Sequence, residues 1–123
     1  MSEILMNQDR KFSRETSMNG VDGWVSHFAF DGMMLTKNGS NIIGHAEIRR
    51  AMEGFFELEN LKFVWEPEKG RLAKSEDLGY TYGAYTREYT NDSGEDTIES
   101  GRYITIWELQ EDGSYKVTVD LGN

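Results

Sequence analysis

The sequence contains no cysteine, a single proline and no long apolar run. Without thiols, the chain can form neither disulfides nor a cysteine-based catalytic or metal site. No segment approaches the roughly 20 apolar residues that span a bilayer, and the first residues lack the apolar core of a secretion signal. We therefore expect a cytoplasmic protein that makes no membrane contact.

Basic residues are also scarce, because 13 Lys and Arg stand against 22 Asp and Glu, giving a net charge of −9. Proteins that bind nucleic acid need clustered positive charge to displace counterions. The adjacent basic pairs, Arg10-Lys11 and Arg49-Arg50, lie in helix-like sequence. The two histidines, His27 and His45, are far apart and lack metal-ligand spacing. We expect no nucleic acid, metal or cofactor.

The 123 residues fit one domain, residues 1–123, and fifteen aromatic residues supply a core despite the modest apolar content. Helical patterns cover residues 2–18 and 21–28, and a short strand is expected at 33–36. A third helix follows Gly44, because Ile48, Ala51, Met52, Phe55 and Phe56 recur at helical spacing.

After residue 60 the apolar period changes from that of a helix to that of a strand. Strands are predicted at 61–65, continuing as 71–74 beyond a bend at Pro67 and Gly70, and then at 80–89, 102–109 and 115–121. Hairpin turns connect these strands, which predicts an antiparallel sheet with helices on one face, an α+β fold.

The strand through residues 103–107 is apolar on both faces, with Ile104 and Ile106 on the side away from Tyr103 and Trp107. A sheet with one solvated face should alternate apolar and polar residues. Homodimerisation through this outer face would explain the pattern. The alternative is a modest exposed apolar strip.

Several motifs in order resemble the nuclear transport factor 2-like superfamily, and the later ones resemble its SnoaL-like branch. They cover about residues 8–123: GVDGW at 20–24, FDG at 30–32, IGHAEI at 43–48, AKSEDLGYTYG at 73–83, GRY at 101–103, Trp107, DG at 112–113 and YKV at 115–117. The resemblance implies a cone-shaped α+β barrel (a cystatin-like roll): three N-terminal helices on a strongly curved antiparallel sheet, with a cavity and commonly a dimer. It implies no single function, because this scaffold serves several.

Ketosteroid isomerase, a member of this superfamily, uses a carboxylate base and two hydrogen-bond donors, a tyrosine and a protonated aspartic acid. The resemblance places the tyrosine position at Phe12, the base at Thr36 and the second donor near Thr105. Phenylalanine cannot donate, and threonine is no base near pH 7. We predict that this mechanism is absent and that the cavity has no carboxylate beside a donor.

The aromatic residues indicate a pocket more strongly than the polar residues do, because rigid rings often line apolar ligand cavities. We predict a pocket that binds a small apolar or cyclic molecule. The alternative function is a non-catalytic homodimeric association module that uses the outer face of the sheet. Whether the protein catalyses a reaction stays open. If the rings pack against one another, little volume remains. The expected ligand contacts are Phe12, Trp24, Phe28, Trp65, Tyr82, Tyr103, Thr105 and Trp107.

Three polar side chains, His27, Glu15 and Asp120, have both a structural and a functional interpretation. His27 is either a base in the cavity or a structural histidine, and His45 is expected to be exposed. Glu15 either meets the pocket or stays solvated. Asp120 alternates away from its apolar neighbours, so it either pairs with Arg102, caps a loop or acts in catalysis.

Overall fold

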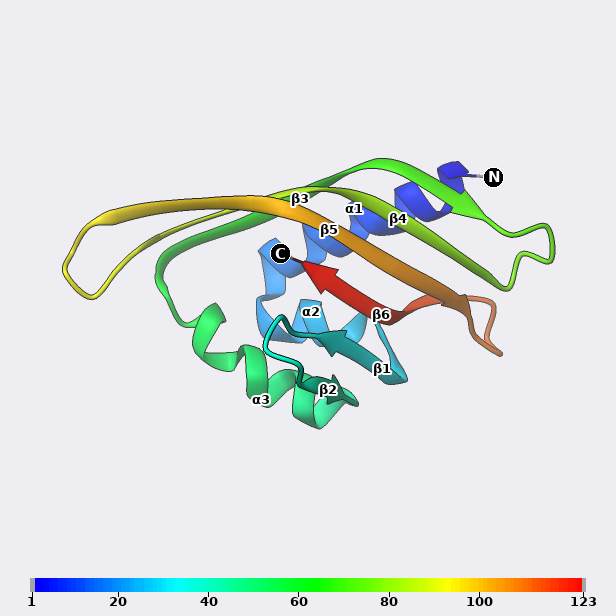
Figure 1. Cartoon of the computed structure of the whole chain (residues 1–123), viewed down its shortest axis with the longest axis horizontal. Coiled ribbons are helices and arrows are strands. Elements are labelled where there is room, and N and C mark those ends of the chain that lie inside the picture. Colours follow the sequence, from blue (N-terminus) through cyan, green and yellow to red (C-terminus); the bar gives the residue numbers. More distant parts are fainter. Residues whose placement is uncertain (1, 123) are drawn as a thin grey trace.

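The computed structural model describes residues 2–122 of the chain. Two helices open the fold, α1 (Ser2–Asn19) and α2 (Val21–Ser26). A hairpin of β1 (Phe28–Leu35) and β2 (Asn41–Ile43) leads into α3 (His45–Phe56). The remaining strands follow in chain order (Figure 1): β3 (Glu59–Leu72), β4 (Leu78–Thr90), β5 (Asp96–Leu109) and β6 (Tyr115–Gly122).

One mixed, curved sheet contains the six described strands in the order β2-β1-β6-β5-β4-β3. The meander β3–β6 is antiparallel, as predicted. The expectation of a wholly antiparallel sheet is wrong at one pair, because β1 and β6 run parallel. The last strand of the meander, β6, lies beside β1 in the sheet and runs in the same direction. The sheet does not close, since β2 and β3 remain its edges.

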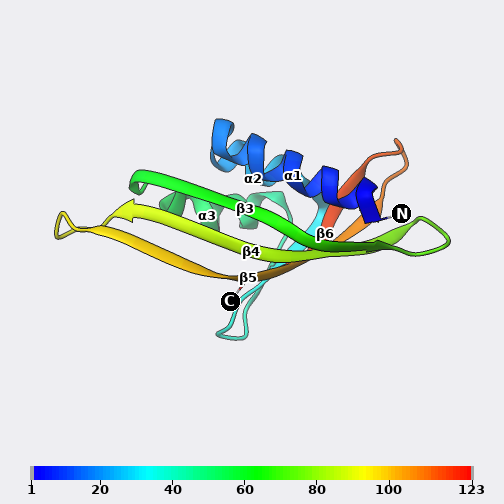
Figure 2. The same ribbon diagram turned by 90° about the horizontal axis from the view of Figure 1, so that it is seen from above.

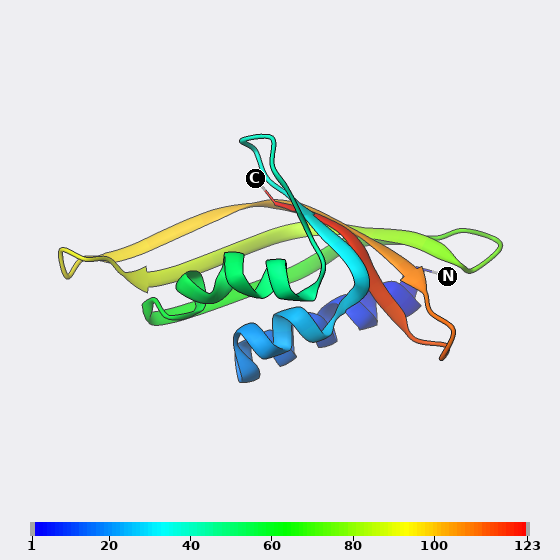
Figure 3. The same cartoon turned by 90° about the horizontal axis from the view of Figure 1, so that it is seen from below.

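The helices all lie on one side of the sheet. Figure 2 shows α1, α2 and α3 on that side, and Figure 3 shows the sheet arching over α1 and α3. The side facing the helices is therefore concave. Within residues 2–122, no helix has the length and apolar composition that a membrane span requires.

Local irregularities shift several strands from their predicted bounds. β1 begins at Phe28 rather than Met33, and Asp31-Gly32 forms an irregular step within it instead of a turn. β3 is one continuous strand whose register shifts between Pro67 and Lys69. Proline is tolerated there because β3 is an edge strand.

Helix α1 presents a buried stripe to the sheet. Leu5, Asp9, Phe12 and Thr16 are at most 2% exposed and recur at helical spacing. Phe12 is the centre of the aromatic core, because its ring centroid lies 4.8 Å from that of Trp65 and 4.9 Å from that of Trp24. The stripe thus fixes α1 over β3 and carries a carboxylate into the core.

Gly83 on β4 lies against the backbone of β3 and the side chain of Tyr103, with no room for a larger side chain. A Cβ atom at this position would meet the backbone oxygen of Glu66 at 2.1 Å and the hydroxyl oxygen of Tyr103 at 2.9 Å. We expect Gly83→Ala to lower the free energy of unfolding by about 2 kcal/mol or more, because the strands must separate. Urea denaturation measures this. Gly54→Ala is the control, since a Cβ there meets no atom within 4 Å and alanine favours the helix. Equal effects of the two changes would contradict this account.

Candidate functional site

A partly enclosed pocket of about 330 Å³ lies between the concave face of the sheet and the helices. Each helix contributes one side chain to its wall: Phe12 from α1, Trp24 from α2 and Met52 from α3. The other lining residues come from the strands and the β1–β2 loop: Met34, Leu35, Thr36, Lys37, Phe63, Trp65, Tyr85, Arg87, Tyr103, Thr105, Asp120 and Gly122.

Five of the eight predicted ligand contacts line this pocket: Phe12, Trp24, Trp65, Tyr103 and Thr105. The rings pack against one another and still leave a cavity, so close ring packing and a pocket are both present. The role of these residues as ligand contacts stays a prediction.

Two predicted contacts lie behind the wall instead of in it. Trp107 is fully buried, and its Nε1 donates to Thr81 Oγ1 at 2.9 Å. Phe28 is 1% exposed and packs edge-on against Phe12, with ring centroids 6.1 Å apart. These two residues support the wall and are not among its lining residues.

The structure places Tyr82 on the opposite face of the sheet, so its assignment to the pocket is wrong. Its strand partner is Ile104, and its ring stacks on that of Tyr80 at 6.4 Å. Successive side chains of a strand alternate between faces. On β4, Thr81 and Tyr85 are buried on the helix side, which leaves Tyr82 outside.

A carboxyl group enters the pocket from β6. Asp120 Oδ1 accepts a hydrogen bond from Thr105 Oγ1 at 2.9 Å, and both residues line the cavity. Burial raises the pKa of Asp120 to about 7; the Thr105 hydrogen bond lowers it and the charge of Asp9 raises it. A carboxyl group that titrates near neutral pH can donate or accept a proton, so the pocket contains a group suited to acid–base chemistry.

An extra residue in β6 turns Asp120 inward. Val117 pairs with Trp107 and Val119 with Ile106, so Thr118 has no partner across the strand pair. Such a bulge reverses the alternation. Asp120 therefore shares the inner face with Val117, whereas regular alternation had placed the two on opposite faces.

A second carboxylate lies directly behind the wall. Asp9 is 0% exposed; its Oδ1 accepts from Trp65 Nε1 and its Oδ2 from the Tyr103 hydroxyl, both at 2.7 Å. Thr81 also hydrogen-bonds to it. Burial raises the pKa of Asp9, and the bonds from Tyr103, Trp65 and Thr81 oppose that rise. We name these four residues the Asp9 cluster.

The prediction of a cavity with no carboxylate beside a donor is therefore wrong. Asp120 stands next to the Thr105 hydroxyl, and Asp9 holds Tyr103 and Trp65 from behind. Phe12, Thr36 and Thr105, the positions compared with the isomerase, do line the pocket. The acidic group comes from a different strand than the resemblance implied.

His27, which follows the end of α2, forms a pair with Glu15 of α1. His27 Nε2 lies 2.8 Å from Glu15 Oε1, and neither residue is among those that line the pocket. Burial lowers the pKa of His27, and the Glu15 hydrogen bond opposes this. His45 is half-buried rather than exposed, with Nε2 2.8 Å from the Phe28 carbonyl oxygen. Among residues 2–122, no three acidic or histidine side chains gather in a metal-binding arrangement.

Sequence reasoning missed Asp9 and Arg87. Asp9 was recognisable, because it interrupts the buried stripe of α1 three residues before Phe12, and a polar residue on such a stripe needs partners. Arg87 gave no comparable signal, since a charged residue late in a strand is usually solvated.

No protein-family model matches this sequence, and comparison with curated proteins gives no match. Solved structures match almost the whole chain. A ketosteroid isomerase-like protein from Erwinia carotovora has a TM-score of 0.80 at 13% identity, covering 97% of this chain and 92% of that one. A protein assigned as a calcium/calmodulin-dependent protein kinase II association domain, from Xanthomonas campestris, has a TM-score of 0.77 at 20% identity, covering 98% and 84%.

A nuclear transport factor 2-like superfamily protein from Salmonella enterica also has a TM-score of 0.77, at 9% identity, covering 98% of this chain and 88% of that one. Identities this low establish a shared fold and carry no activity with them. The helices on one face of a curved sheet agree with the predicted α+β architecture. The chain has the nuclear transport factor 2-like fold.

Proposed function

We propose that the pocket binds a small apolar or cyclic molecule, with the Asp120–Thr105 pair as its polar contact. The observation that supports this most is the cavity itself, walled by rings and holding one hydrogen-bonded carboxyl group. Its volume of about 330 Å³ is near the lower end for ligand pockets, so we expect a ligand of about one or two rings.

The three tryptophans provide a test within the molecule. Trp24 and Trp65 line the pocket, and Trp107 is buried behind it. On titration with small cyclic compounds such as indole and naphthol, we expect the indole N–H resonances of Trp24 and Trp65 to shift several times more than that of Trp107. Equal shifts of all three, or none with any compound of a broad panel, would refute the proposal.

Met52 offers a matched change in pocket size. We expect Met52→Ala to enlarge the pocket and to move its preference toward bulkier ligands, measured as the ligand-induced rise in Tm across a size series. Met18→Ala is the control, because Met18 is 69% exposed and is not a lining residue. Identical size profiles for both variants would argue against this pocket as the binding site.

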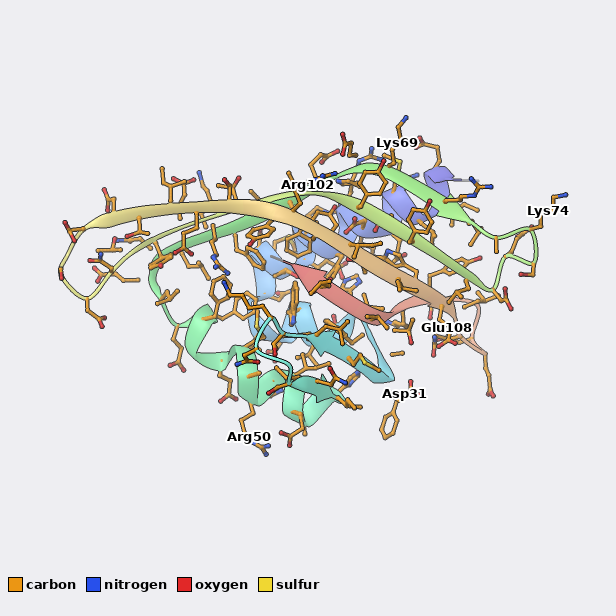
Figure 4. All side chains as sticks on the ribbon, in the orientation of Figure 1. Asp31, Arg50, Lys69, Lys74, Arg102 and Glu108 are labelled. Atoms are coloured by element: carbon orange, nitrogen blue, oxygen red, sulfur yellow. The ribbon has the colours of Figure 1, made fainter. Side chains whose placement is uncertain are left out.

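A second candidate function is association through the outer face. On the side away from the helices, a groove of about 320 Å³ is lined by Leu78, Tyr80, Ile104 and Ile106, together with Arg71, Ala73 and Gly79. Charged side chains border this face in Figure 4, among them Lys69, Arg102 and Glu108. An apolar centre with a charged rim is typical of protein interfaces. This supports a homodimer, which is compatible with a ligand pocket.

Sedimentation tests the dimer. Ile104 is 38% exposed within the groove, and we expect Ile104→Lys to turn a dimer into a monomer because the charge would be buried at the interface. Ile98→Lys is the control, since Ile98 is 69% exposed on the same strand and lies outside the groove. A monomeric wild type at micromolar concentration would refute this candidate function.

A further inference from the structure

The pocket reverses the charge balance of the chain. The whole sequence has 22 acidic and 13 basic residues, whereas the lining residues include two basic side chains, Lys37 and Arg87, and one acidic side chain, Asp120. An apolar ligand without charge would use neither cation. Their place beside an apolar cavity therefore needs an explanation of its own.

Arg87 is held in a defined position. Its guanidinium carbon lies 5.7 Å from the ring centroids of both Phe55 and Tyr85, within cation–π distance. Its Nε donates to Glu99 Oε1 at 2.6 Å, and the Tyr89 hydroxyl donates to the other oxygen of that carboxylate at 3.2 Å. A guanidinium has five N–H donors. Within the described residues this ion pair uses Nε, so the two Nη groups retain donors for a ligand.

Lys37 reaches the same pocket from the β1–β2 loop. It follows Leu35 and Thr36, which are themselves lining residues, and it is exposed. Lys37 takes part in none of the ion pairs that form among the described side chains. Fifty positions separate Lys37 from Arg87 in sequence, so the fold alone brings these two cations to one cavity.

We propose that the ligand of this pocket is an apolar molecule that carries one carboxylate, with its apolar body against the rings and its carboxylate held by Lys37 and Arg87. This rests on the proposed function of the pocket and specifies the ligand class. The net charge of −9 opposes anions, and the repulsion grows with the charge of the ligand. A monoanion with a large apolar part therefore fits better than a phosphate ester.

The test compares naphthalene carboxylate with the uncharged naphthalene carboxamide, which has nearly the same shape. At about pH 6 the carboxylate probe is ionised, and much of Asp120 is still neutral, so repulsion by Asp120 is small. We expect the carboxylate to bind the wild type about fivefold to tenfold more tightly than the amide. Raising the salt concentration from about 20 to about 200 mM should weaken the binding of the carboxylate only.

Two variants locate the charge contact. Lys37→Gln and Arg87→Gln should each lower the affinity for the carboxylate about threefold more than the affinity for the amide, because only the carboxylate loses a charge contact. Lys37→Gln breaks no ion pair between described side chains, so its result does not depend on the stability of the Arg87–Glu99 pair. Lys69→Gln is the control, because Lys69 lies on β3 and is not a lining residue (Figure 4).

Equal or tighter binding of the amide would overturn the carboxylate inference and leave the apolar pocket intact. Tighter binding of naphthyl phosphate than of the carboxylate would also overturn it. If neither naphthalene compound nor any other compound of the panel binds, the proposed function itself fails. The two failures are therefore distinguishable.

Discussion

Asp120→Asn is expected to stabilise the protein at neutral and alkaline pH and to flatten the pH dependence of its stability. Burial raises the pKa of Asp120 from 3.8 to about 7, so the folded state binds a proton more tightly than the unfolded state. Wild-type stability should therefore fall as pH rises from about 4 to about 7 and level off above that. Asparagine keeps the acceptor for Thr105 and carries no charge.

The measurement is urea denaturation of wild type and Asp120→Asn at several pH values. Between the pKa values of the unfolded and folded states, a carboxyl group that titrates in full changes the free energy of unfolding by about 1.4 kcal/mol per pH unit. Because part of the side chain is open to the pocket, we expect the stability difference between the two proteins to change by roughly 2 kcal/mol over this range.

Asp112→Asn supplies a control of opposite sign. The Ser114 hydroxyl donates to Asp112 Oδ1 at 2.6 Å and lowers the pKa of this exposed carboxyl, so its contribution to stability is lost as the pH falls. A difference between wild type and Asp120→Asn that does not vary with pH would show that Asp120 titrates normally.

Asp9→Ala is expected to lower the free energy of unfolding by about 3 kcal/mol or more. The change leaves the buried Trp65 Nε1 and the Tyr103 hydroxyl without the acceptor they reach at 2.7 Å, and it also removes a partner of Thr81. Each buried donor left without a partner costs about 1–3 kcal/mol. Urea denaturation followed by tryptophan fluorescence measures the stability.

Asp9→Asn keeps this prediction testable if the alanine variant does not fold. Its amide retains one acceptor oxygen and turns an NH₂ group toward the other donors, so we expect an intermediate loss of stability. Asp22→Ala is the control, because Asp22 is exposed and its 2.7 Å pair with Arg49 is a surface ion pair worth little. A stability within about 1 kcal/mol of wild type for both Asp9 variants would contradict a structural role of the Asp9 cluster.

The Asp9 cluster and Asp120 are connected through the pocket wall. Asp9 holds the Tyr103 hydroxyl, and the ring of Tyr103 lines the cavity that Asp120 enters. The charge of Asp9 also contributes to the raised pKa of Asp120, after burial. Burial and the Asp9 carboxylate raise the pKa of Tyr103, so this hydroxyl remains a donor to Asp9 at all physiological pH values.

The local pattern of the chain was sufficient for its helices and for the β3–β6 meander. Helical spacing identified α3, and the helix-side position of Phe12 followed from the resemblance. These features depend on neighbours in sequence and on regular periodicity, which a sequence displays directly. Tyr82 obeys the same regularity, because it lies three positions from the buried Tyr85 on one strand and therefore on the opposite face.

The amino-acid sequence by itself determined the α+β architecture, the acidic surface and the supply of rings for a core. Tertiary structure alone decided the chemistry of the pocket, because each deciding step depends on residues distant in sequence. An unpaired Thr118 turns Asp120 inward, α1 carries Asp9 to Tyr103 on β5, and a loop brings Lys37 to the cavity that Arg87 also lines. A bulge and a long-range contact leave no periodic trace in the chain, since both are set by the competition among strand pairings in the folded sheet.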